Sequence, residues 1–66
     1  MSDYISRMEE EQYELLQRMA KLAEFMGSKD FMNLYEHQKE LLSIQYHAMH
    51  TYETCLTARI RWAKAL

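Results

Sequence analysis

Hydrophobic residues in the first third of the chain recur with the spacing of an α-helix. They fall alternately three and four positions apart, which is the heptad pattern of helices that pack side by side. The members of this row are Ile5, Met8, Gln12, Leu15, Met19, Leu22 and Met26, of which Gln12 is the one polar interruption. Leu16, Ala23 and Phe25 widen the row beyond the narrow stripe of a two-stranded coil. The pattern predicts a helix over residues 3–26 with an apolar face that more than one neighbour covers.

Residues 34–66 contain neither glycine nor proline, and their apolar positions keep a helical period. A broad stripe runs along this segment and consists of Leu41, Leu42, Gln45, Ala48, Met49, Tyr52, Cys55, Leu56, Arg59, Ile60 and Ala63. A helix of this length measures roughly 50 Å at about 1.5 Å per residue. Cys55 lies on the stripe, so we expect it to be a small core residue rather than a reactive thiol. The pattern predicts a second helix over residues 34–65.

Residues 27–33 separate the two predicted helices. Gly27 is the only glycine and stands where a left-handed C-terminal cap would end the first helix. Ser28 can begin a single helical turn, and Asn33 followed by Glu36 has the spacing of a capping box that starts the second helix. Because a short corner between two long helices turns the chain back on itself, we predict an antiparallel hairpin.

The position of the turn sets which residues of the two helices meet. A turn centred near residue 30 places Leu15 beside Gln45 and Ile5 beside Cys55, and the second helix then extends about two and a half turns past the start of the first. This overhang holds Arg59, Ile60, Trp62 and Leu66. Because a single hairpin leaves these groups without a partner, we predict an all-α fold in which the hairpin oligomerises, as a dimeric four-helix bundle or a higher assembly.

The small size of the chain supports the same expectation. A chain of 66 residues makes one domain, residues 1–66, and buries only about 60% of the surface that it exposes when unfolded. The single cysteine cannot form an intrachain disulfide, and the histidines and the thiol match no zinc-binding spacing. Association with a second copy is therefore the expected additional source of stability.

Charge and motifs exclude several classes of function. The net charge of −2 argues against general binding to DNA or to an anionic membrane. No basic leader with an apolar run opens the sequence, and no run of about 20 apolar residues occurs, so we expect a soluble cytoplasmic protein. His47 and His50 are too few to hold a metal, and we expect no cofactor. No acid/base pair or activated nucleophile has a recognisable spacing, so we do not expect an enzyme.

A set of residues spread over nearly the whole chain resembles a known family. The set comprises Tyr4, Ile5, Arg7, Met8, Glu11, Leu15, Arg18, Lys21, Leu22, Phe25, Phe31, Leu34, Leu41, Leu42, Gln45, Met49, Tyr52, Leu56 and Arg59. It resembles a family of very small helical bacteriophage proteins that is named after a crAss-like phage protein. The resemblance implies a phage or prophage origin.

The predicted architecture is also similar to that of oligomeric phage sponges. Those proteins sequester the cyclic nucleotide messengers of bacterial immunity, which are cyclic dinucleotides, cyclic trinucleotides or cyclic ADP-ribose derivatives, in pockets between subunits. The sequence contains no diagnostic sponge motif, so this similarity exists at the level of the fold.

The candidate ligand-binding residues lie at the end of the hairpin where the first helix starts and the second finishes. A nucleotide needs cations for its phosphates and flat side chains for its bases. Arg7, Arg59 and Arg61 offer the first, and Tyr4 and Trp62 offer the second. The alternative is that the two aromatic residues belong to a subunit interface, where the arginines pair with acidic residues of a neighbouring copy.

Two functions follow from this pattern. The first is a phage counter-defence protein that sequesters a cyclic nucleotide signal at subunit interfaces, without catalysis, in the cytoplasm of the host bacterium. The second is a helical interaction protein that binds and inhibits or modulates a host protein. The polar residues of the stripes, Gln12, Gln45 and Arg59, fit either role, since they can fix the register of assembly or contact a ligand.

Overall fold

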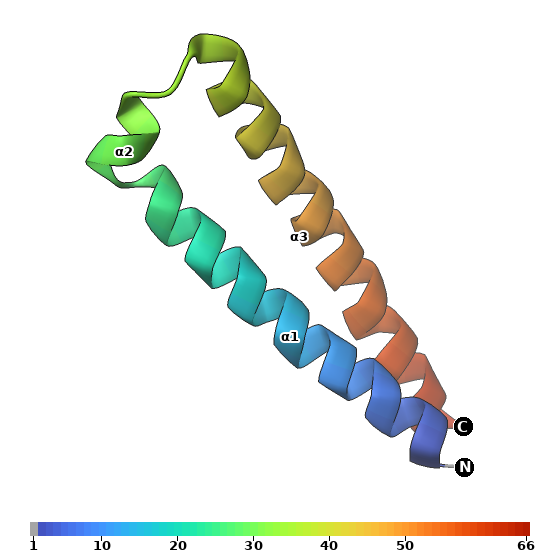
Figure 1. The fold of residues 1–66 in the computed structure, drawn as a ribbon. Coiled ribbons are helices and arrows are strands. Elements are labelled where there is room, and N and C mark those ends of the chain that lie inside the picture. Colours follow the sequence, from blue (N-terminus) through green and yellow to red (C-terminus); the bar gives the residue numbers. More distant parts are fainter. Residues whose placement is uncertain (1) are drawn as a thin grey trace.

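The computed structural model describes residues 2–66 and contains two long helices that pack against each other (Figure 1). Helix α1 spans Ser2–Met26, the short helix α2 spans Lys29–Met32, and helix α3 spans Glu36–Ala65. Figure 1 shows α1 and α3 side by side, with the two termini at one end and α2 at the other. The Cα atoms fill a rod of 48 × 15 × 12 Å. The predicted all-α fold with two long packed helices is confirmed.

The heptad row of α1 is the face that α1 turns towards α3. Met8, Leu15 and Met19 are buried. The other four members of the row, Ile5, Gln12, Leu22 and Met26, are half-buried. A row that alternates three and four positions stays on one side of a helix, so a single neighbouring helix can cover all of it. The polar member, Gln12, lies within this contact.

The corner forms without a left-handed glycine. No described residue has a positive φ, so the predicted left-handed cap at Gly27 is wrong. The backbone N–H of Gly27 instead donates to the carbonyl oxygens of Ala23 and Glu24, each at 3.2 Å. The chain changes direction at Ser28, where the extended backbone (φ −93°, ψ 165°) ends one helix and starts the next. The Ser28 hydroxyl oxygen accepts the N–H of Phe31 and so caps α2.

Helix α3 begins later than the sequence pattern predicts. Tyr35, with φ −65° and ψ 153°, is its N-cap, and the backbone N–H of Tyr35 donates to Oε1 of Gln38 at 3.3 Å. The predicted capping box between Asn33 and Glu36 is therefore wrong. Asn33 ends α2, and its backbone N–H donates to the carbonyl oxygens of Lys29 and Asp30. The physical reason is that Asn33 already caps the C-terminal end of α2 and so cannot also begin α3.

The register of the hairpin differs from the predicted one. Ile5 packs against the buried cluster of Met8, Leu56 and Ile60, and Ala63 packs against the same cluster. Figure 1 shows the last turns of α3 beside the first turns of α1. The predicted pairing of Ile5 with Cys55 and the predicted overhang are both wrong, because α2 and the extended Tyr35 move the centre of the turn further along the chain. The homodimer that the overhang was used to support stays a prediction.

The predicted stripe of α3 divides between two heptad rows, which also include Tyr46, Glu53, Trp62 and Leu66. The inner row faces α1 and is buried or half-buried; it comprises Leu42, Tyr46, Met49, Glu53, Leu56, Ile60 and Ala63. The outer row is exposed and comprises Leu41, Gln45, Ala48, Tyr52, Cys55, Arg59, Trp62 and Leu66. The predicted core position of Cys55 is therefore wrong, since its thiol belongs to the outer row. The inner row contacts α1 because it holds more of the large aliphatic side chains, whose burial stabilises most.

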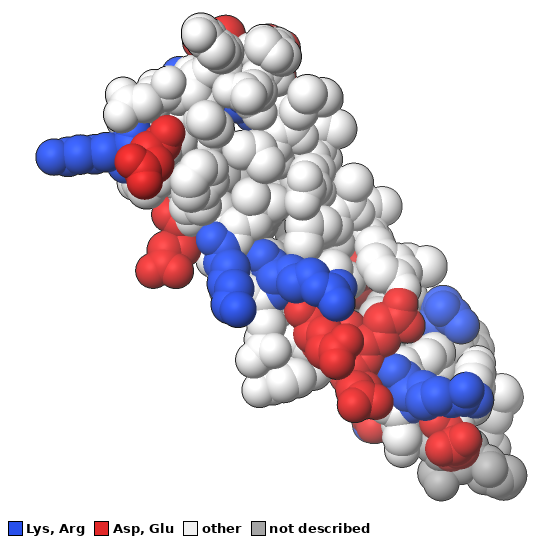
Figure 2. Space-filling view, viewed as in Figure 1, with Lys and Arg blue, Asp and Glu red and all other residues white. Residues whose placement is uncertain are grey.

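The surface charges gather along α1 and near the termini (Figure 2). The same view shows a largely uncharged surface along the middle of α3. Between Glu40 and Arg59 the only Asp, Glu, Lys or Arg of α3 is Glu53, which lies in the inner row. Within residues 2–66, no helix combines the length and the apolar character needed to cross a membrane.

Candidate functional site

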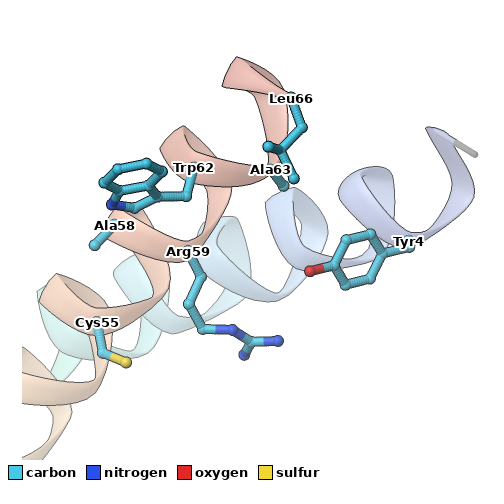
Figure 3. A pocket seen from close by; sticks show the side chains of 7 residues that line it. All are labelled: Tyr4, Cys55, Ala58, Arg59, Trp62, Ala63 and Leu66. Atoms are coloured by element: carbon cyan, nitrogen blue, oxygen red, sulfur yellow. The ribbon is translucent and has the colours of Figure 1, made fainter.

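An open hollow lies where α3 finishes beside the start of α1, and we call it the terminal hollow. Its volume is about 380 Å³. Its walls are formed by Tyr4, Cys55, Ala58, Arg59, Trp62, Ala63 and Leu66 (Figure 3). Tyr4 comes from α1, Leu66 directly follows α3, and the other members come from α3. The structure therefore brings together three of the five ligand-binding candidates, namely Tyr4, Arg59 and Trp62.

The polar groups of the terminal hollow are arranged around Arg59. Figure 3 shows the Tyr4 hydroxyl and the Arg59 guanidinium turned into the same space beside α3, while the Trp62 indole points away from the guanidinium and lies near Ala58. The Trp62 side chain is 72% exposed and Tyr4 is 52% exposed, so both rings present free surface. A guanidinium that shares one hollow with two accessible aromatic rings can hold an anionic group while a ring stacks on a flat part of the same molecule.

Local helix geometry explains why these side chains meet. Arg59 and Trp62 are three residues apart in α3, so they project from the same side of the helix. Both belong to the outer row, which α1 does not cover. Tyr4 precedes the buried row of α1 by one position and flanks the contact between the two helices. The side chain of Tyr4 therefore reaches the edge of the outer row instead of entering the core.

Arg59 carries a charge that no acidic group of the described chain neutralises. The ion pairs within residues 2–66 are formed by Arg7, Arg18, Lys39 and Lys64 with Asp3, Glu14, Glu36 and Glu9, respectively. Neither Arg59 nor Arg61 belongs to any of these pairs. A cation without a carboxylate partner can bind an external anion without first breaking an internal ion pair.

The other two candidates lie outside the terminal hollow. Arg7 forms an ion pair with Asp3, 3.9 Å apart, in which both side chains are more than two-thirds exposed. Arg61 lines a separate hollow of about 350 Å³ together with Glu53, Thr54, Thr57 and Ala58. The sequence places all five candidates at one end of the hairpin, but helical rotation distributes them over different sides of that end.

Another hollow lies at the opposite end of the hairpin, and we call it the corner hollow. It has a volume of about 400 Å³ and is lined by Phe25, Leu34, Gln38, Leu41 and Leu42. Leu41 belongs to the outer row, so the two hollows are connected along α3 by that row. We did not predict the corner hollow from the sequence. The only indication in the sequence is that Leu41 and Trp62 belong to one row of positions that alternate four and three residues apart.

The two polar glutamines of the stripes occupy different environments. Gln12 lies in the contact between α1 and α3, where its amide donates to Oγ1 of Thr57 at 2.7 Å. Gln45 is exposed and lies in the outer row. Gln12 therefore belongs to the packing of the hairpin, whereas Gln45 remains accessible to another molecule.

Comparison with known proteins gives one informative result. The Sequestin family model matches residues 2–62, which is most of the chain and includes Tyr4, Arg59 and Trp62. No curated protein and no solved structure gives a significant match. A family match of this extent covers both long helices and the corner between them, and on this basis the chain belongs to the Sequestin family.

Proposed function

We propose that this protein sequesters a cyclic nucleotide immune signal, without catalysis, as a counter-defence protein of a bacteriophage in the cytoplasm of its host. The family name denotes sequestration, which supports a binding role. The observation that carries the proposal is the terminal hollow, in which Arg59 has no internal carboxylate partner and shares the walls with two exposed aromatic side chains, Tyr4 and Trp62.

The chemistry of the terminal hollow fits a nucleotide. The Arg59 guanidinium offers a planar fork of N–H donors, which can bind two oxygens of one phosphate. Tyr4 and Trp62 offer flat faces on which a base can stack, and stacking of this kind is worth about 1–3 kcal/mol per base. The Tyr4 hydroxyl, which is turned into the same space as the Arg59 guanidinium, can add a hydrogen bond to the same phosphate or to a ribose.

Sequestration sets its own requirement on this site. A protein that removes a signal by binding alone acts in proportion to its copy number. Its dissociation constant for the signal must therefore lie below the working concentration of that signal. The terminal hollow is open to solvent, and a wall from another subunit would bury more of the ligand and raise the affinity. The proposal therefore places the bound ligand at a contact between subunits.

The test is titration of the purified protein with a cyclic dinucleotide, a cyclic trinucleotide and a cyclic ADP-ribose derivative. Binding is followed by calorimetry and by the fluorescence of Trp62, the only tryptophan. We expect Arg59→Ala to weaken binding about 10- to 100-fold, because a hydrogen bond to a charged group contributes about 1.5–3 kcal/mol. Arg59→Lys keeps the charge but loses the fork, so we expect an intermediate affinity.

Arg18→Ala is the matched control for this test. Arg18 is exposed, forms an ion pair with Glu14 and lies outside the terminal hollow. We expect the control to bind as the unaltered protein does. The proposal is refuted if no member of the ligand panel binds, or if Arg59→Ala and Arg18→Ala bind equally well.

A second candidate function rests on the exposed outer row. Leu41 is 61% exposed and Tyr52 is 43% exposed on a helix side with little charge, which is a surface that a host protein can cover. In this case the protein would bind and modulate that host protein. Affinity purification from infected cells would then recover one host protein in a fixed ratio, and Tyr52→Glu would abolish the recovery while Arg59→Ala would not.

A further inference from the structure

The outer row of α3 has the heptad spacing that a helix shows on a side covered by another helix, in addition to the side that faces α1. Its eight members alternate four and three positions from Leu41 to Leu66, so they form one continuous seam along about 37 Å of helix. The residues that flank the seam on the side away from the inner row are Ile44, Thr51, Ala58 and Ala65. Arg59 is the only charged residue among all of these. A seam of this kind is typical of contact between two helices rather than of a helix surface in water.

We propose that a second copy of this chain covers the outer row, with the two α3 helices antiparallel around a two-fold axis that passes between Tyr52 and Cys55. In this register Leu41 meets Leu66 of the second copy, and Ala48 meets Arg59. The inference deepens the proposed function, and its site assignment rests on that function. It names the partner that completes the terminal hollow.

The order of side chains along the seam favours a second copy. An antiparallel pair about this axis matches each member of the row with another member, so no position is left over. Large side chains then face small ones in the two kinds of contact nearest the axis, since Tyr52 meets Cys55 and Arg59 meets Ala48. Alternation of large and small residues across facing positions lets two surfaces interdigitate. The seam is therefore complementary to itself, which is the property that a contact about a two-fold axis requires.

Charge decides between the antiparallel and the parallel arrangement. In a parallel pair, Arg59 of each copy would occupy the same level of the seam, and two like charges would face each other at a buried contact. In the antiparallel pair, Arg59 lies level with residue 48 of the other copy, so the two Arg59 positions are about 16 Å apart along the axis. This separation exceeds the screening length of about 8 Å in physiological salt.

The antiparallel register brings the two kinds of hollow together. Gln45 lies level with Trp62 of the second copy, and Leu41 lies level with Leu66. The corner hollow of one chain, which contains Leu41, therefore faces the terminal hollow of the other, which contains Leu66. Two equivalent composite sites result. Each combines Arg59, Trp62 and Tyr4 of one chain with Gln45 and Phe25 of the other.

Gln45 gives this composite site a means of recognising a base. Its exposed amide offers two N–H donors and a carbonyl acceptor, which can pair with the edge of a base that is stacked on Trp62. Within its own chain Gln45 lies far along α3 from Arg59, so one ligand can touch both groups only across the two copies. The site is incomplete in a single hairpin.

Distance measurement tests the register. A nitroxide label at Glu40→Cys, in a chain that also carries Cys55→Ala, reports the separation of the two copies by pulsed electron resonance. Position 40 lies outside the seam and is exposed. The antiparallel register predicts a label separation of about 40 Å, whereas a parallel pair predicts less than about 20 Å. A short distance, or no dipolar coupling at protein concentrations of tens of micromolar, overturns the register.

A charge placed at the centre of the seam tests whether the outer row is the surface through which two copies associate. Tyr52→Glu places two carboxylates close together beside the axis, so we expect sedimentation to show a monomer. Tyr13→Glu is the matched control, since Tyr13 is 63% exposed on α1 and lies outside both hollows. We expect this variant to remain dimeric. Circular dichroism of Tyr52→Glu establishes that the hairpin is still helical, and a helical Tyr52→Glu dimer overturns the inference.

Mixing of variants tests whether the site is shared. We expect Arg59→Ala and Gln45→Ala each to lose most ligand binding, because every site then lacks one group. In the antiparallel dimer a mixed pair has one site with both groups intact, so an equal mixture of exchanged chains should recover about a quarter of the binding capacity. No recovery, or normal binding by Gln45→Ala, overturns the shared site.

The outcomes separate this inference from the proposed function. If no ligand of the panel binds but the labels lie about 40 Å apart, the proposed function and its shared site fail while the antiparallel dimer stands. If a cyclic nucleotide binds to a sedimenting monomer in a manner that depends on Arg59, the proposed function stands and the dimer fails. If a host protein covers the outer row in place of the second copy, the dipolar coupling between labels about 40 Å apart is absent and the dimer fails.

Discussion

The Gln12 amide on α1 donates a hydrogen bond to the Thr57 hydroxyl on α3, with 2.7 Å between Nε2 and Oγ1. Thr57 in turn donates to Oε2 of Glu53 at 2.7 Å, and Gln12 also donates to the same oxygen at 3.3 Å. These three half-buried side chains form a polar network within an otherwise apolar contact. Because Gln12 of α1 donates to both polar groups of α3, a shift of either helix along the other would break the network.

A double-mutant cycle on this pair should reveal a coupling. We expect Gln12→Ala and Thr57→Ala to interact by about 0.5–1.5 kcal/mol, the usual net contribution of a buried hydrogen bond. Urea unfolding followed by circular dichroism measures the four variants at one protein concentration. The control cycle uses Gln17→Ala and Tyr13→Phe, which removes an exposed bond within α1, and its coupling should remain below about 0.5 kcal/mol. Equal couplings in both cycles would contradict a role in the register.

Leu56→Ala should destabilise the hairpin more than the replacement of any other apolar side chain by alanine. Leu56 is 0% exposed and contacts Met8 and Ile60 in the core cluster. We expect Leu56→Ala to lower the free energy of unfolding by about 2–5 kcal/mol, because it removes buried methyl groups and leaves a cavity. Leu16→Ala removes the same atoms at a position that is 45% exposed, and we expect less than half the effect. Chemical denaturation compares the two, and a similar loss in both variants would contradict the position of the core.

Gly27→Ala should stabilise the protein. The φ of Gly27 is not positive, and a Cβ added there would lie 3.7 Å from the carbonyl oxygen of Glu24, an ordinary contact distance. Alanine restricts the unfolded chain more than glycine does, so we expect a gain of about 0.4–1 kcal/mol in the free energy of unfolding. Thermal unfolding measures the change. A lower midpoint would indicate that Gly27 uses a conformation that alanine cannot adopt.

The ion pair between Lys64 and Glu9 should make only a small and salt-dependent contribution. Nζ of Lys64 lies 2.6 Å from Oε2 of Glu9, but the side chains are 58% and 43% exposed. We expect Lys64→Gln to lower the free energy of unfolding by less than about 1 kcal/mol at low salt. The difference should vanish at about 1 M salt, where charges are screened over about 3 Å. Lys21→Gln serves as the control, because Lys21 belongs to none of the ion pairs within residues 2–66.

The candidate site was predictable only in part. The sequence suggests that arginines and aromatic residues gather where the two helices end, and the terminal hollow contains Tyr4, Arg59 and Trp62. The separation of Arg7 and Arg61 from this hollow was not predictable, because it depends on how each helix is rotated about its axis. That rotation is set by the contact between the two helices, which is not a local property of either.

The sequence by itself determined the helices and the buried face of α1. Periodicity is a local property, since the spacing of Ile5, Met8 and Leu15 fixes one side of a helix whatever lies opposite. Only the tertiary structure decided the register and the choice between the two rows of α3. The corner residues Lys29–Met32 form a helical turn, which moves the pairing along the chain. The inner row holds Leu56 and Ile60 and therefore buries more apolar surface against α1. The outer row, with Arg59 and Trp62, is left to face another molecule.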